Sequence, residues 1–165
     1  MADETGVDFE ACWQAALAAY GHPGVEAACM ALQDDYGLDV IVILTLGWLA
    51  ARRTGLSDPG LDALVAAARP WQEGVVKPLR ELRRRLKSED DPAMARVYDS
   101  LKKSELEAER SEMEALLAAL ARIETSTGDG PPDSSELIAR YAARAGVSLD
   151  KMAENYIRTI AQAYG

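Results

Sequence analysis

The feature that most constrains this chain is an almost uninterrupted apolar run, Val40 to Ala51, which only Thr45 and Gly47 interrupt. The run has 12 residues, whereas a membrane-spanning helix needs about 20. A helix formed by this run is apolar on every side, so it is stable in water only where other elements surround it. The run therefore predicts a helix at about residues 40–51 that lies at the centre of a globular core.

Composition favours a helical fold around this core. The chain has 165 residues, of which 48% are hydrophobic and only 6% aromatic, and this is an ordinary length for one domain. Ala and Leu are abundant, which is more typical of helices than of a β-sandwich or barrel. We therefore predict an all-α protein, a compact irregular bundle of about seven or eight helices.

Charge and cysteine content bear on partners and compartment. The net charge of −9 makes nucleic acid an unexpected partner, because attraction to phosphates needs a basic surface. The acidic N-terminus has no apolar segment typical of a secretory signal, and no run is long enough for a membrane span. Cys12 and Cys29 are interpreted as buried, reduced thiols. These features predict a cytoplasmic protein.

The stretch ALQDDYGLDV, residues 31–40, has two interpretations. Gly37 can take the left-handed conformation that ends a helix, and Asp39 can cap the helix that follows. The spacing of Asp34, Asp35 and Asp39 also resembles the aspartate-rich magnesium motif of isoprenoid diphosphate synthases. Gly37 interrupts the helix that such a motif needs, so the first interpretation is favoured. Asp34 and Asp35 then lie at a helix C-terminus, where carboxylates are disfavoured and call for a basic partner.

Other boundaries divide the chain into three parts. Pro70 and Pro78 are expected to disturb the helices that contain them. Residues 93–124 form one long amphipathic helix or two in tandem. We predict a helical domain at residues 1–124, a Gly/Pro/Ser-rich linker at 125–135, and a C-terminal helical pair at 136–165 that packs on the same domain.

The segment WQEGVVKPLRELRRRLK, residues 71–87, carries an unusual concentration of basic residues. Lys77, Arg80, Arg84 and Lys87 recur at helical spacing and so share one face. This face either pairs with acidic helices of the same chain or docks an acidic partner. Of these residues Arg80 is expected to be internal. The candidate docking face consists of Trp71, Lys77, Arg84 and Lys87.

Several segments together resemble a small bacterial family of unknown function, which is predicted to be all-helical and cytoplasmic. They are YGHPGVEAACMALQDDYGLDV, GWLA, WQEGVVKPLRELRRRLK and SELEAER, and the resemblance covers about residues 9–123. One departure is Ile41, where the family pattern leads us to expect Asn. The resemblance implies no activity, cofactor or partner. It does imply a set of polar positions that could form a pocket: Gln33, Asp34, Asp39, Arg80, Glu105 and Glu109.

No catalytic or metal-binding motif is recognisable. The chain has one histidine, no phosphate-binding loop and no nucleophile beside an evident base, so we expect no metal and no cofactor. Two functions remain open. The favoured one is a non-enzymatic interaction or regulatory module with an unknown protein partner. The alternative is a small-molecule-binding or enzymatic bundle with a carboxylate–arginine pocket, which requires these polar side chains to converge around free space.

Overall fold

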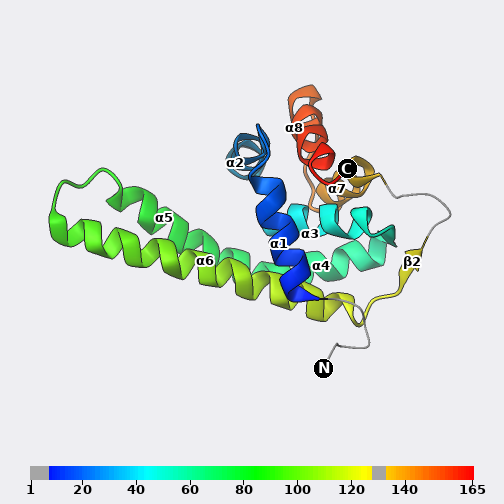
Figure 1. The fold of residues 1–165 in the computed structure, drawn as a ribbon, viewed down its shortest axis with the longest axis horizontal. Coiled ribbons are helices and arrows are strands. Elements are labelled where there is room, and N and C mark those ends of the chain that lie inside the picture. The colour runs from blue at the N-terminus through cyan, green and yellow to red at the C-terminus, as the bar shows by residue number, and fades with distance from the viewer. Residues whose placement is uncertain (1–7, 128–132) are drawn as a thin grey trace.

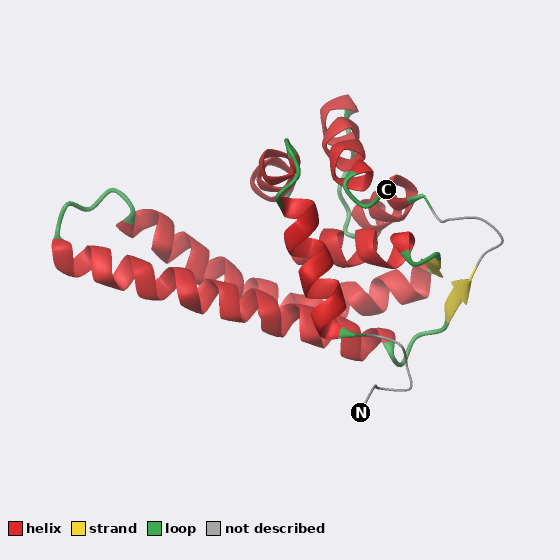
Figure 2. Ribbon diagram, viewed as in Figure 1, coloured by secondary structure: helices red, strands yellow, loops and turns green. Residues whose placement is uncertain are grey.

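The computed structural model describes residues 8–127 and 133–165. These residues form, in order, α1 (Phe9–Tyr20), α2 (Val25–Tyr36), α3 (Val40–Ala51), β1 (Thr54–Leu56), α4 (Asp58–Trp71), the π-helical turn η1 (Gln72–Val76), α5 (Lys77–Leu86), α6 (Pro92–Leu120), β2 (Thr125–Thr127), α7 (Ser134–Arg144) and α8 (Lys151–Gln162). The predicted all-α bundle is confirmed (Figures 1 and 2). None of the described helices is long and apolar enough to cross a membrane.

Helix α3 is the centre of the bundle. Every residue from Ile41 to Ala50 is buried, and α1, α2, α4, α6 and α7 all contact this helix. The prediction from its apolar sequence is therefore confirmed. Thr45 is tolerated in this environment because its hydroxyl donates a hydrogen bond of 2.7 Å to the backbone oxygen of Ile41, which satisfies the polar group locally.

The connection between α2 and α3 has the conformation that residues 31–40 predict. Gly37 ends α2 with a φ of 68°, in the left-handed region that glycine adopts without strain. The amide of Leu38 donates to the oxygen of Leu32 at 3.1 Å. Asp39 caps α3, accepting a hydrogen bond from the amide of Ile41 at 3.0 Å. Helix termination and capping thus account for Gly37 and Asp39 without a metal.

Pro70 and Pro78 lie in the helical segment that runs without a gap from α4 through η1 to α5. Pro70 lies within α4 and does not end it. Beyond it the amide of Lys77 donates to the oxygen of Gln72, five residues back, and Pro78 follows in the first turn of α5, where its missing N–H matters least. The π-helical turn η1 thus separates the two prolines. Residues 77–104, comprising α5, its connection and the first part of α6, project as a helical hairpin that we call the arm (Figure 1).

The segment from residue 125 differs in part from the predicted linker. Thr125–Thr127 forms a short strand antiparallel to Thr54–Leu56, which the sequence pattern did not predict. The short pairing had no alternating pattern that could reveal it. Residues 128–132 lie outside the described part of the chain.

The C-terminal helices pack against the rest of the bundle. Helix α7 contacts α3, and α8 contacts α2. The chain end is anchored by Tyr164, whose hydroxyl donates to the oxygen of Leu44 at 2.9 Å. Its ring covers Gly47, where an added Cβ would overlap it. The glycine in the apolar run is therefore the position at which α3 accepts the C-terminal tyrosine.

Candidate functional site

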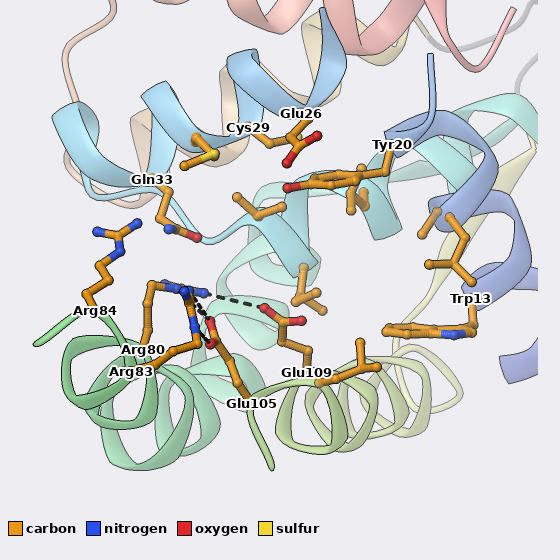
Figure 3. Close-up of a pocket in the computed structure, with 17 residues that line it drawn as sticks. Trp13, Tyr20, Glu26, Cys29, Gln33, Arg80, Arg83, Arg84, Glu105 and Glu109 are labelled. Atoms are coloured by element: carbon orange, nitrogen blue, oxygen red, sulfur yellow. Dashed lines mark hydrogen bonds and ion pairs between the residues drawn. The ribbon is translucent and has the colours of Figure 1, made fainter. Parts of the chain in front are cut away.

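A cleft of about 350 Å³ lies between α1 and α2 on one side and α5 and α6 on the other, with α3 at its base (Figure 3). Its larger apolar side chains are Trp13, Leu17, Tyr20, Met30, Leu44 and Leu106. Its charged side chains are Glu26, Arg80, Arg83, Arg84, Glu105 and Glu109. The cleft therefore combines apolar walls with charged groups that come mainly from α5 and α6.

Arg80 is the centre of the charged cluster. Its side chain is only 10% exposed, and its Nε donates to Oε1 of Glu105 at 3.1 Å. Its Nη2 lies 3.5 Å from Oε1 of Glu109. Arg83 also donates to Glu105, through Nε to Oε2 and through Nη2 to Oε1. Glu105 therefore holds two arginines, and Arg80 joins two carboxylates (Figure 3).

Helical periodicity explains why these residues meet. Glu105 and Glu109 are four residues apart on α6, and Arg80 and Arg83 are three apart on α5, so each pair shares a helix face. The hairpin at residues 87–91 folds α5 back along α6 and brings the two faces together. The sequence predicted Arg80 to be internal, and its burial confirms this.

Glu109 differs from Glu105 in how completely it is paired. Its side chain is 24% exposed, against 9% for Glu105, and its ion pair with Arg80 is the longer one. Burial, together with the neighbouring Glu105, raises the pKa of Glu109 to about 7 against the opposing effect of Arg80. Glu109 therefore changes its charge near neutral pH, at the edge of the cleft.

The six polar positions implied by the family resemblance do not all come together. Gln33, Arg80, Glu105 and Glu109 line the cleft. Asp34 lies at the surface, where its carboxylate accepts from Arg84 at 3.1 and 3.2 Å, so Arg84 is the basic partner that its position near the end of α2 calls for. Asp39 lines a different hollow, beside Tyr141.

The four residues of the candidate docking face lie on different surfaces. Arg84 lines the cleft, whereas Trp71 lines a shallow groove on another side of α5 and α6. Lys77 is exposed and pairs with Glu73 at 3.6 Å, and Lys87 is exposed. A docking role for this set stays a prediction.

A second acidic group, Glu112, is fully buried next to Asp39. Both oxygens of Glu112 and Oδ2 of Asp39 lack a hydrogen-bond donor among the described residues, so the two carboxyl groups are left to share a proton. Burial, together with the neighbouring Asp39, raises the pKa of Glu112 to about 11. Burial likewise raises the pKa of Asp39, although the capped amides oppose the shift. Glu112 is therefore protonated at neutral pH.

Sequence reasoning missed Glu112 and the opposite wall of the cleft. Glu112 was detectable, because it follows Glu105 and Glu109 at the next helical interval on the same face of α6. Trp13, Tyr20 and Glu26 carried no such signal. They face α5 and α6 only because α1 and α2 are folded across that side of α3.

Glu112→Gln tests the buried acid pair through the pH dependence of stability. Because its folded pKa lies above the unfolded value of about 4.5, native wild type holds a proton that the unfolded chain releases, and stability falls as pH rises above about 5. Gln keeps the shape and cannot ionise. Between pH 6 and 8 the free energy of unfolding of Glu112→Gln, measured relative to wild type, should therefore increase with pH. We expect the increase to approach about 1.4 kcal/mol per pH unit.

Urea unfolding at several pH values measures this difference. The matched control is Glu107→Gln on the exposed side of α6, which should show no pH-dependent gain. If both variants follow the wild-type pH profile, Glu112 is not a protonated acid in the folded protein.

Comparisons with known proteins assign this chain to one family. A family model described as "Protein of unknown function (DUF2390)" matches residues 11–116. Neither a search of curated proteins nor a search of solved structures finds a match. The match leaves out α7 and α8 and includes every residue discussed for the cleft. The resemblance seen in the sequence is confirmed, and the chain belongs to the DUF2390 family of proteins of unknown function.

Proposed function

We propose that this protein binds a small organic molecule in the cleft between α1, α2, α5 and α6. The observation that carries the proposal is that Arg80, Glu105 and Glu109 converge and still leave a volume of about 350 Å³ beside them. Small-molecule sites commonly have volumes of about 300–1,000 Å³, with apolar walls and a few convergent polar groups. Had these side chains filled the space by pairing, the cleft would be absent.

The rim of the cleft supports a binding role. Leu17, Met30 and Leu106 are 48%, 44% and 48% exposed, although they are large and apolar. All three line this cleft. A ligand that covers them removes apolar surface from water, which contributes about 25 cal/mol per Å².

The chemistry of the cleft favours binding over catalysis. Cys29 contributes a thiol to the lining of the cleft. Burial raises the pKa of this thiol to about 12, so it is not a nucleophile near neutral pH. Arg80, Arg83 and Glu105 hold one another in place. We infer a site that selects a ligand by shape and charge, without a covalent step.

The test is an NMR screen of a library of small fragments that covers cations, anions and neutral compounds. We expect some members to give saturable shifts of the Trp13 indole and Gln33 amide signals. Leu106→Trp, which adds bulk at an exposed rim position, should abolish these shifts. Met152→Trp on α8 is the matched control, since Met152 is 60% exposed and does not line the cleft. A library that leaves the cleft signals unchanged contradicts the proposal.

The interaction module predicted from the sequence is a second candidate, and the arm supports it. Residues 77–104 contain nine Lys or Arg and five Asp or Glu, in a chain with a net charge of −9. Met94 and Val97 are 40% and 46% exposed on the same arm. A basic projection with exposed apolar side chains suits an acidic protein partner. The buried free thiols of Cys12 and Cys29 support the cytoplasm as the proposed location.

Lys77→Glu with Lys87→Glu tests this second function. Both lysines are exposed, so stability should change by less than about 0.5 kcal/mol. A protein that copurifies with wild type should be lost from the double variant, most clearly at low salt, where surface charges act over longer distances. Lys151→Glu on α8 is the control and should retain it. Equal recovery by all three proteins would rule out docking through these lysines.

A further inference from the structure

The arginines of the cleft are already engaged by carboxylates. Arg80 and Arg83 bind Glu105, and Arg80 also reaches Glu109. Arg84 is held by both oxygens of Asp34. An anionic ligand would therefore meet arginines whose positive charge is already matched by carboxylates of the protein.

Two other carboxylates of the cleft, those of Glu26 and Glu109, are less engaged. Glu26 forms no ion pair with any described residue, although it lines the cleft. Glu109 binds Arg80 through Oε1 only, and its Oε2 accepts no hydrogen bond from the described residues. Figure 3 shows the Glu26 carboxylate, the Tyr20 hydroxyl and the Glu109 carboxylate directed into the same space. The free capacity of the cleft is therefore for hydrogen-bond donors and positive charge.

The aromatic walls suit the same kind of ligand. Trp13 stacks on Phe9 with ring centroids 6.1 Å apart, and the guanidinium of Arg110 lies 5.0 Å from the Trp13 centroid. These contacts fix the Trp13 ring at the cleft wall. Because Arg110 already supplies a cation to this ring, Trp13 offers a ligand its apolar area, which can cover an apolar chain.

We propose that the ligand is an organic cation, a protonated amine on an apolar body, with its ammonium group between Glu26 and Glu109. This inference rests on the proposed function of the cleft and adds the chemical class of the ligand. The apolar body lies against the buried ring of Trp13 and against Leu17 and Leu106, which otherwise expose apolar surface.

Binding is coupled to the protonation of Glu109. The groups that face this carboxyl are Arg80 of α5, Glu105 and Glu112 of α6, Asp39 before α3 and Tyr20 of α1. An ammonium group favours the ionised carboxylate, so it lowers the pKa of Glu109 from about 7 and releases a proton on binding. The amine itself stays protonated, so its affinity rises with pH from 6 to 8, by up to about tenfold.

The experiment compares three probes of the same shape and different charge: 3-phenylpropylamine, 3-phenylpropan-1-ol and 3-phenylpropionate. NMR titration at pH 8 should show the amine binding about tenfold more tightly than the alcohol, a difference of about 1.4 kcal/mol, with the carboxylate weakest. Glu109→Gln should weaken the amine and remove the pH dependence, and Glu26→Gln should weaken it while keeping the pH dependence. The control Glu107→Gln, on the exposed side of α6, should bind as wild type does.

The outcomes separate this inference from the proposed function. Tightest binding of the carboxylate, or equal binding of all three probes, overturns the amine assignment and leaves the cleft as a ligand site. Failure of all three probes at this cleft, while other library members bind there, also overturns the assignment alone. Absence of binding by any fragment removes the proposed function and the ligand class together.

Discussion

The burial of Arg80 between two carboxylates is the interaction on which the rest of this structure depends. A guanidinium that is only 10% exposed is tolerated only when its charge is matched and its donors are satisfied. Glu105 and Glu109 do this from a neighbouring helix. The requirement fixes the rotation of α5 relative to α6 and places a charged layer where two packed helices would ordinarily bury apolar side chains.

That charged layer keeps the cleft open. The apolar faces of α1 and α2 pack on α3 and cannot close over Arg80 without desolvating it further. Leu17, Met30 and Leu106 consequently remain at the rim, half-exposed. The pKa of Glu109 rises to about 7 in the same layer, because the carboxyl group is buried and lies beside Glu105. The open shape of the cleft, its apolar rim and the raised pKa of Glu109 thus all follow from the pairing of α5 with α6.

Much of the fold could be predicted from local sequence, because local rules determine it. The central helix follows from an apolar run without a polar face, and its entry follows from Gly37 and Asp39, whose conformation and cap depend only on neighbouring residues. The strand at Thr125–Thr127 was not predicted, because three residues are too few to show the alternation of apolar and polar side chains that marks a strand. The turn η1 lies between Pro70 and Pro78, and rules applied to each proline separately do not predict it.

The site was predictable only in part, for a related reason. Arg80, Glu105 and Glu109 lie at helical spacing on two elements that are adjacent in sequence, so their meeting could be expected. Asp34 pairs with Arg84 across the space between α2 and α5, and no local pattern encodes this contact. The same holds for Trp13 and Tyr20, which come from α1, the first described helix.

The central claim, that Arg80 is a buried and matched charge whereas Arg84 forms a surface pair, is tested most directly by urea unfolding of Arg80→Met and Arg84→Met. The two residues lie on one helix, and methionine keeps most of the apolar stem of each. Arg80→Met should lower the free energy of unfolding by about 3 kcal/mol or more, because Glu109 is left buried without a cation. Arg84→Met should lower it by less than about 1 kcal/mol, as expected for an exposed ion pair. Equal and small losses for both variants would contradict the account, since the pairing of α5 with α6 would then not depend on a buried charge.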